Sequence, residues 1–569
     1  MQQPGGTPEG KNLILALVLS VGMLLAWQYF VVEPDIQRAE QQAAQQKLEQ
    51  AKGETAPLQA AKIETAEEPE VPEAPAPHVA LESPSLTGGI GLKGARIDRL
   101  TLKDYYQDPK QSDNVSLLAP SNSELPYFAE FGWVSGTSGI EVPGRDTMWQ
   151  TDGTELTPES PLTLYWTNPQ GIRFEQKISL DEDFMFTVES RVINNSGQLV
   201  NLYPYGLINR TYLDDKEHFF ILHEGPLAVL DETLQEISYE ELRDDGPTKM
   251  QNTKGWLGIT DKYWLTAMVP ETTFNATFQH YNRSNSDKYQ VDYLGQAHAI
   301  APGENGEVTV RFFAGAKKVN MLDAYSEKYN IPLFDRAVDF GMLYFLTKPI
   351  FHALHYFHDL LGNFGLAIML LTVCIKLVLF PLANKSYKAM SQMKVLMPKV
   401  QEIREQYKDD SLKMNQEMMA LYKKEGVNPA SGCLPMLLQL PIFFALYKVL
   451  FVTIEMRHAP FYGWINDLSA PDPTNVFTLF GLLEWGPPDF LHIGLWPLIM
   501  AATMVIQQKL NPKPTDPVQA QVMAWLPYIF LFLFAGFPAG LVIYWAWNNT
   551  LSIIQQYVIT RRYRVQTDS

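Results

Sequence analysis

The chain has 569 residues, a formal net charge of −18 and a hydrophobic content of 46%. It is too long for one domain, and its charge is uneven: residues 33–332 hold 46 Asp and Glu against 25 Lys and Arg (net −21), which leaves the rest near +3. A region this acidic would repel the negatively charged backbone of nucleic acid, so we expect no DNA partner.

The N-terminal segment is apolar. Leu13–Val32 is 20 residues long, enough to cross a bilayer. It runs into Glu33-Pro34 rather than into a small-residue cleavage site, so 1–32 is predicted to be an uncleaved signal anchor, with a cleaved signal peptide as the alternative. Residues 33–83 are rich in Ala, Gln, Glu and Pro, which cannot bury a core, and are predicted to be a disordered or extended linker.

Residues 84–330 have the pattern of β-strands. Leu162–Thr167 and Ile172–Ile178 alternate apolar and polar residues on either side of the turn Asn168–Gly171, which is a hairpin signal, and Phe184–Ile193 repeats the pattern. Many short strands with Gly, Asn and Pro turns predict an antiparallel β-sandwich. Its role is open between a groove for a small ligand or sugar and a plain spacer or docking module.

Residues 331–349 are predicted to form an interfacial amphipathic helix with three charged residues on one side. These are Asp335, Arg336 and Asp339. His352 and His355 in the next segment would also share a helical face. No carboxylate completes a ligand set with them, so no metal site is predicted.

Lys376 is the most informative residue of the predicted second span, 350–383, because it lies inside the apolar run Phe364–Phe380. The next basic residue toward the following loop, Lys385, is nine residues on, or about 13 Å along a helix. A charge at the centre of a membrane helix costs about 2.5–3.5 kcal/mol, so we expect Lys376 to face a polar hollow inside the membrane. The alternative is that its amine extends to the nearer interface.

Residues 384–432 are predicted to form a cytoplasmic αα-hairpin. Methionines recur at three- and four-residue steps in both arms, a seam pattern that Asp409–Ser411 interrupts, and Pro398 should bend the first arm. They are Met390, Met393, Met397, Met414 and Met418. These side chains could simply pack the hairpin, or they could contact varied apolar clients while the basic flank meets ribosomal RNA or lipid.

Four further apolar spans follow the hairpin, which gives six in all. They cover 433–454, 493–509, 522–537 and 541–559. Segment 384–432 carries nine Lys and Arg, whereas the loop 455–492 carries one, Arg457. By the positive-inside rule the hairpin, the loop 510–521, the tail 560–569 and the N-terminus are cytoplasmic, and the acidic domain lies in a periplasm-like space.

Several polar residues in the spans are unusual for simple anchors. The candidate groove residues are Lys376, Thr372, Gln439, Gln508, Tyr544, Trp545 and Asn548. Each alone could join two helices, but polar groups in lipid are tolerated where they face a cavity, so together they predict a shared hydrophilic groove. Lys448, near the outer end of the third span, is expected to extend toward Glu455.

The sequence contains no P-loop, nucleophile-elbow or zinc-protease motif, so no enzyme activity and no cofactor are predicted. The two cysteines, Cys374 and Cys433, lie in or beside apolar spans. The acidic domain therefore has no disulfide, and the separation of 59 residues (433 − 374) fits no zinc site.

Three segments closely resemble the YidC membrane-protein insertase family of Gram-negative bacteria. They are Gly362–Met390 (GNFGLAIMLLTVCIKLVLFPLANKSYKAM), Met418–Tyr447 (MMALYKKEGVNPASGCLPMLLQLPIFFALY) and Phe537–Gln556 (FPAGLVIYWAWNNTLSIIQQ). The resemblance implies a five-helix core around a groove that opens to cytoplasm and lipid, and an outer domain that is a β-supersandwich. Bacterial members usually have arginine where this chain has Lys376, and lysine lacks the planar, always-charged guanidinium.

The same resemblance implies that Thr372, Tyr544 and Trp545 line the client path. It also implies that the hairpin receives nascent chains from the ribosome, and that the outer domain contacts the Sec translocon. The hypothesis is that an apolar client segment enters lipid while its polar flank crosses through the groove, where Lys376 attracts acidic residues. Each Leu or Ile contributes about −0.3 to −0.6 kcal/mol, so one span can offset one or two charges.

Two other functions are weighed against the insertase. The first is a solute transporter with a periplasmic sensing domain, which would predict paired internal repeats that the sequence lacks. The second is an anchored envelope scaffold, for which Lys376 would be incidental.

Overall fold

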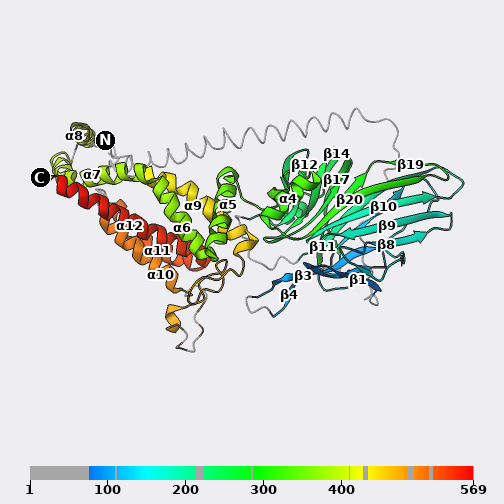
Figure 1. The fold of residues 1–569 in the computed structure, drawn as a ribbon. Coiled ribbons are helices and arrows are strands. Elements are labelled where there is room, and N and C mark those ends of the chain that lie inside the picture. The colour runs from blue at the N-terminus through cyan, green and yellow to red at the C-terminus, as the bar shows by residue number, and fades with distance from the viewer. Residues whose placement is uncertain are drawn as a thin grey trace. The chain divides into compact units, whose positions relative to one another are not determined.

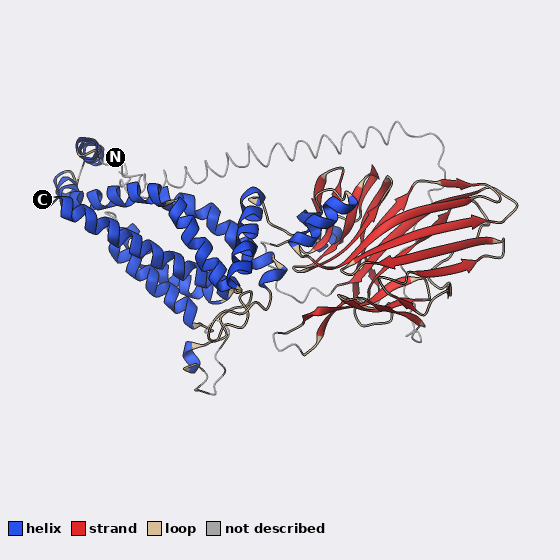
Figure 2. Ribbon diagram, viewed as in Figure 1, coloured by secondary structure: helices blue, strands red, loops and turns tan. Residues whose placement is uncertain are grey.

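The computed structural model describes residues 76–108, 112–212, 222–283, 286–408, 410–426, 434–480, 482–483, 486, 488, 492–511 and 517–567. The predicted anchor 1–32 and the linker up to residue 75 lie outside these residues. The chain divides into two compact units: Val395–Asn428 belongs to one, and Ala61–Lys394 with Pro429–Ser569 to the other. Within the second unit the strands and most of the helices segregate along the chain (Figure 2).

Two β-sheets make up residues 78–316, which we call the sheet domain (Figure 1). The eleven-stranded sheet contains, in spatial order, β14 (Thr248–Thr253), β17 (Phe274–Arg283), β18 (Ser286–Gly295), β11 (Val200–Thr211), β5 (Tyr127–Ser135), β3 (Arg96–Tyr106), β2 (Leu86–Gly91), β1 (His78–Glu82) and β7 (Glu155–Leu156), with β19 (His298–Ile300) beside β11 and β4 (Asn114–Leu118) beside β3. The nine-stranded sheet contains β13 (Thr233–Glu236), β12 (Gly225–Leu230), β15 (Gly255–Thr260), β16 (Trp264–Pro270), β20 (Asn305–Ala316), β10 (Met185–Asn194), β9 (Ile172–Leu180), β8 (Leu162–Thr167) and β6 (Gln150–Thr151).

The predicted hairpin is confirmed as the β8–β9 pair. Leu162 faces Ile178 and Thr167 faces Arg173 across an antiparallel ladder. Asn168 closes the turn because its side-chain oxygen accepts a hydrogen bond from the Ile172 amide at 2.8 Å. Gly171 adopts φ +86°, a conformation that an L side chain would strain.

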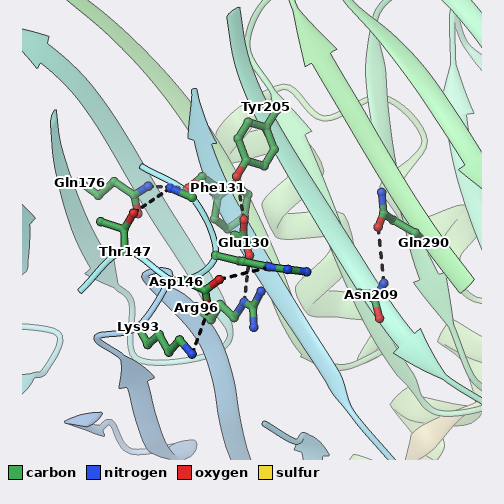
Figure 3. A network of polar contacts seen from close by, with 12 residues as sticks. Lys93, Arg96, Glu130, Phe131, Asp146, Thr147, Gln176, Tyr205, Asn209 and Gln290 are labelled. Carbon is green, nitrogen blue, oxygen red and sulfur yellow. Dashed lines mark hydrogen bonds and ion pairs between the residues drawn. The ribbon is translucent and has the colours of Figure 1, made fainter. Parts of the chain in front are cut away.

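The core lies between the two sheets and combines aliphatic side chains with several aromatic rings. Phe131 on β5 packs edge-to-face on Phe312 of β20, with ring centroids 5.7 Å apart. Gln176 on β9 is also buried there, and its amide donates to the Phe131 carbonyl at 2.5 Å. Figure 3 shows this amide near a second polar cluster on the larger sheet, in which Glu130 accepts from Tyr205.

Two sequence predictions for this domain need correction. The linker does not extend to residue 83, because His78–Glu82 already forms β1, with Val79 and Leu81 buried. The sheets are not wholly antiparallel, because β1 pairs with β7 in parallel. A five-residue strand directly after a Pro- and Glu-rich run is too short to change the local composition, which explains the misplaced boundary.

Helices dominate the chain after β20. They are α4 (Val319–Tyr329), α5 (Tyr344–Leu361), α6 (Phe364–Val378), α7 (Phe380–Gln406), α8 (Ser411–Lys424), α9 (Leu434–Val452), α10 (Leu495–Leu510), α11 (Pro517–Ala535) and α12 (Ala539–Thr567), with the short α3 (Tyr239–Asp244) inside the sheet domain and 3₁₀ turns at η2 (Phe334–Ala337), η4 (Ile454–Met456) and η5 (Val476–Thr478). The last four predicted spans each correspond to one helix, α9 to α12. Helix α10 packs against both α11 and α12, and α5 against both α6 and α9 (Figure 1).

The predicted second span, 350–383, is not one helix. Gly362 ends α5 in the left-handed conformation (φ +68°), and Asn363 caps α6 by accepting from the Leu366 amide at 3.1 Å. A second break at Leu379 bends α6 from α7 by 69°. Within the described ranges, only this bent pair has the length and apolar composition to cross a membrane, and no single helix does.

The predicted interfacial helix 331–349 is also wrong in its bounds. Only η2 and the first turns of α5 are helical there, so Asp335 and Asp339 do not share a helical side. Asp335 is buried and pairs with Lys348 at 2.8 Å. Asp339 pairs instead with Lys448 at 2.8 Å, which also corrects the expected Lys448–Glu455 contact.

Two helices, α7 and α8, lie in the predicted hairpin 384–432; α7 ends at Gln406 and α8 begins at Ser411. Asp410 caps α8 by accepting from the Lys413 amide at 3.0 Å, and Lys399 on α7 pairs with Glu425 at 3.2 Å. Pro398 lies inside α7. All five seam methionines are half-buried, whereas Leu396 and Val400 in the same stretch are buried.

Candidate functional site

Lys376 lies in the last turn of α6 and points toward α12. Its Nζ donates to the Ser552 hydroxyl at 2.9 Å, and that hydroxyl donates in turn to the Asn548 carbonyl at 2.8 Å. Ser552 is 3% exposed, so the ammonium is held against a buried wall. Among the described residues, no carboxylate forms an ion pair with Lys376.

Beside Lys376 is a cavity of about 310 Å³, which we call the groove. Its lining comes from α6, α7, α9, α10, α11 and α12. The polar lining residues are Lys376, Tyr387, Gln439, Gln507, Gln508, Asn511, Tyr544, Asn548, Asn549, Ser552 and Gln555. Apart from one cation these are neutral, and the described lining contains no Asp or Glu.

One wall of the groove is aromatic. The Trp545 ring of α12 lies 4.6 Å from Phe443 of α9 and 5.9 Å from Phe530 of α11, between ring centroids. All three residues line the cavity. The groove therefore combines a polar wall around Lys376 with an apolar wall, and an amphipathic chain segment could contact both.

Two lining groups have no protein partner. The Asn548 side-chain oxygen and the Gln555 side-chain nitrogen are buried and make no hydrogen bond with described protein groups. Others are satisfied: Gln439 donates to the Tyr544 hydroxyl at 2.7 Å, and Asn549 donates to Thr503 at 3.2 Å. A buried polar atom without a partner costs free energy, so these two atoms are suited to a polar guest.

Six of the seven predicted groove residues line this cavity. They are Lys376, Gln439, Gln508, Tyr544, Trp545 and Asn548. Thr372 does not: its hydroxyl donates to the Ile368 carbonyl of its own helix at 2.6 Å, and its side chain is buried. Thr372 lies one turn before Lys376, but its hydroxyl bonds within its own helix instead of facing the groove.

Sequence reasoning missed three lining residues that contact the cation or extend its wall. These are Ser552, Gln555 and Tyr387. The first two follow Asn548 at i+4 and i+7, a spacing that places all three on one face of α12 and could have revealed them. Met390, expected to contact clients in the hairpin, also lines the groove.

The histidines of α5 pack on aromatic rings. His358 stacks on Phe364 with ring centroids 3.7 Å apart, and His355 on Phe351 at 5.9 Å. In the part of the chain that the structure describes, no three His, Cys, Asp or Glu side chains are grouped as metal ligands.

Comparisons with known proteins cover nearly the whole chain. Residues 78–353 match the family model of the YidC periplasmic domain, and 356–567 that of the 60Kd inner membrane protein. The membrane protein insertases YidC of Rickettsia bellii (strain OSU 85-389) and Rickettsia akari (strain Hartford) are 49% and 50% identical over 554 residues, which cover 97% of this chain and 98% and 99% of theirs. A crystal structure of an active YidC insertase with its first transmembrane domain resolved aligns with 85% of this chain and 93% of its own, at 17% identity and a TM-score of 0.36.

Proposed function

Because this chain belongs to the YidC family of membrane protein insertases, we propose that it inserts nascent membrane-protein segments into the bacterial inner membrane through the groove beside Lys376. It is an insertase and not an enzyme, and the family favours this function over a solute transporter. The observation that carries the proposal is the groove itself, in which one cation and several carboxamides lie among apolar helices.

The charge on Lys376 gives the groove a direction of selectivity. Lys376 lies in the last turn of α6, within an apolar segment where a charge is costly to bury, and no carboxylate in the described lining offsets that cost. An acidic client side chain in the groove would gain a partner, and the lysine would gain one too. Lys376 should therefore lower the free-energy cost of moving acidic residues next to a client segment across the membrane.

The carboxamides suit a guest that brings both donors and acceptors. A client flank that leaves a helix or has yet to form one exposes backbone N–H and C=O groups, which cannot stay unpaired in lipid. The Asn548 oxygen and the Gln555 nitrogen are buried without partners, so rotation of either side chain toward the guest would supply an acceptor or a donor without breaking an existing bond of that atom. The aromatic wall at Trp545 then contacts the apolar part of the client.

The size of the driving force sets a limit on the cargo. A span of 20 residues gains several kcal/mol from its Leu and Ile at about 0.3–0.6 kcal/mol each, which offsets one or two charges at about 3 kcal/mol each. We therefore expect the groove to serve short, weakly charged translocated tails rather than long charged loops.

The proposal includes topology and partners. Six spans would place both termini and the α7–α8 hairpin in the cytoplasm, with the sheet domain in the periplasm. The hairpin, with its half-buried methionines and basic residues, would receive chains from the ribosome. The sheet domain and the start of α5 would contact the Sec translocon for clients that need it. These assignments rest on charge distribution and family likeness.

Insertion of single-span reporters into proteoliposomes tests the role of Lys376. The translocated tail would carry zero, one or two Asp residues. Lys376→Glu should slow insertion more with each added Asp, because the groove then repels the tail, and Lys376→Ala should lie in between. The matched control is Lys385→Glu, which makes the same charge change at an exposed position of α7 outside the groove lining. Equal slowing of all three reporters in Lys376→Glu would refute the electrostatic role.

A further inference from the structure

The C-terminal end of α9 contacts the sheet domain, and the segment that joins this domain to α5, through several charged side chains. Lys448 forms its ion pair with Asp339 at 2.8 Å, and both side chains are less than one-fifth exposed. Asp339 is itself held in place, because its carboxylate accepts from the amides of Gly341 at 3.0 Å and His223 at 3.3 Å. Asp339, the partner of Lys448, is thus held by one backbone amide before η2 and one after it.

Two cation–aromatic contacts join the end of α9 to the sheet domain. In one the cation follows α9, and in the other it belongs to the sheet domain. Arg457, just after α9 and η4, donates to the carbonyl of Tyr106 at the end of β3 and lies 5.4 Å from the centroid of the Trp264 ring on β16. Lys262, in the turn before β16, places its ammonium 3.8 Å from the centroid of the Phe451 ring on α9. Such contacts are worth about 0.5–2 kcal/mol each, depending on desolvation.

Glu455 adds a further contact between these elements. Its carboxylate is buried beside the backbone of Val319, the first residue of α4. The N-cap residue of α4, Lys318, supplies no side-chain bond to that helix end, so the Glu455 carboxylate lies near the positive end of the helix dipole. We call Asp339, Lys448, Glu455, Arg457 and Lys262 together the joint.

The joint and the groove share one helix. Helix α9 runs without a break across Pro441, and Gln439 lies nine residues (448 − 439) before Lys448, or about 13 Å along the axis. Gln439 donates to the Tyr544 hydroxyl inside the groove at 2.7 Å. A displacement of the outer end of α9 would therefore reach the groove through a rigid element.

We propose that Asp339 and Lys448 are positioning residues of the groove: the sheet domain holds Asp339 through the His223 amide, and Asp339 holds α9 in the register that brings Gln439 to Tyr544. This rests on the proposed function of the groove. It gives the sheet domain a part in insertion that needs no ligand and no client contact, because the domain serves as the fixed support of one groove wall.

The labelling rate of a cysteine at Leu440 measures the position of this wall. Leu440 lines the groove and is 44% exposed. In the full chain, with Cys374 and Cys433 changed to Ser, Leu440→Cys would be labelled with a water-soluble maleimide in native membranes. The variants are Lys448→Asp, the milder Lys448→Met, and the exchange of charges in Asp339→Lys with Lys448→Asp. The control is Ile506→Cys on α10, which is 51% exposed and outside the groove lining.

We expect the rate at position 440 to change several-fold in Lys448→Asp and Lys448→Met, to return toward the parent value in the charge exchange, and to stay constant at position 506. An unchanged rate at 440 in a folded Lys448→Met variant would overturn the proposal. The groove hypothesis is tested separately, because Lys376→Glu alters the dependence on tail charge whether or not α9 moves.

Discussion

The sheet domain and the groove treat buried cations differently. In the sheet domain Arg96 pairs with Glu130 at 2.9 Å, and Tyr205 donates to the other oxygen of that carboxylate at 2.7 Å (Figure 3). Burial alone would lower the pKa of Arg96, but Glu130 raises it above its ordinary value. In the groove Lys376 has a hydroxyl partner and, among the described residues, no carboxylate. A buried charge with a complete set of partners serves the fold, whereas a cation that lacks a counter-charge and also lines a cavity, as Lys376 does, is available to a client.

The strongest test of this difference is removal of the arginine from its pair. Arg96→Met leaves Glu130 buried without a cation, and breaking a buried pair in this way costs about 3–5 kcal/mol. Hydrogen exchange of β3 and β5 amides in the full chain would measure the loss as a lower free energy of opening. The double variant Arg96→Met, Glu130→Leu should recover part of it. Exchange rates unchanged by Arg96→Met would show that the pair contributes little.

The joint should respond to pH through Glu455. Desolvation raises the pKa of Glu455 to about 7, against the opposing effects of its amide contacts and Lys318. Between about pH 4.5 and 7 the folded state keeps a proton on Glu455 that the unfolded state has released. The stabilisation by this proton is therefore complete below about pH 4.5 and is lost as the pH rises to 7, and the free energy of unfolding falls by about 3 kcal/mol. The protection factors of the α4 amides, from which the intrinsic rise of exchange with pH has been removed, should therefore fall between these pH values. Glu455→Gln should flatten the profile, and a profile equally steep in that variant would assign it to another group.

Local patterns predicted the elements that depend on nearby residues. The β8–β9 hairpin and α9 to α12 follow from alternation, turn residues and apolar runs within a few positions of one another. The break at Gly362–Asn363 was missed although its signal is local, because Gly is a common C-cap and Asn a common N-cap. The apolar run on both sides of it suggested one long span.

The site was predictable where several polar residues share one apolar environment. Lys376, Tyr544 and Asn548 stand out in their spans because each would be costly in lipid, and the cavity that they line needs contributions from six helices. The partners of the charges were not predictable. Asp339 lies 109 residues before Lys448, and nothing in either neighbourhood marks the other. Ion pairs of this kind depend on the tertiary fold, not on periodicity.

Replacing the groove cation should not lower the free energy of unfolding, whereas Arg96→Met should lower it. Lys376→Met removes a charge that has no counter-charge, so the free energy of unfolding should stay constant or rise by up to about 2–3 kcal/mol. Thermal unfolding in detergent would measure it, while insertion of acidic-tailed reporters should fall. Lys317→Met is the matched control, because Lys317 is also buried and donates to a hydroxyl, that of Thr260 at 2.9 Å, but lies outside the groove lining. A loss of stability in Lys376→Met as large as that in Arg96→Met would contradict the distinction.

The smallest effect is expected at an exposed ion pair of the sheet domain. Lys177 and Glu189 face each other on β9 and β10 at 2.8 Å, with side chains 50% and 34% exposed. Exposed pairs contribute about 0.2–1 kcal/mol, because water and salt screen them, so a double-mutant cycle with Lys177→Ala and Glu189→Ala should give a coupling energy in that range. The Lys448–Asp339 pair has the same distance and the same kinds of side chain, but its members are 19% and 18% exposed. Its coupling energy should therefore be the larger of the two and should fall less with added salt. Equal values would mean that burial does not strengthen the joint, and its hold on α9 would then depend on the contacts of Arg457 and Lys262.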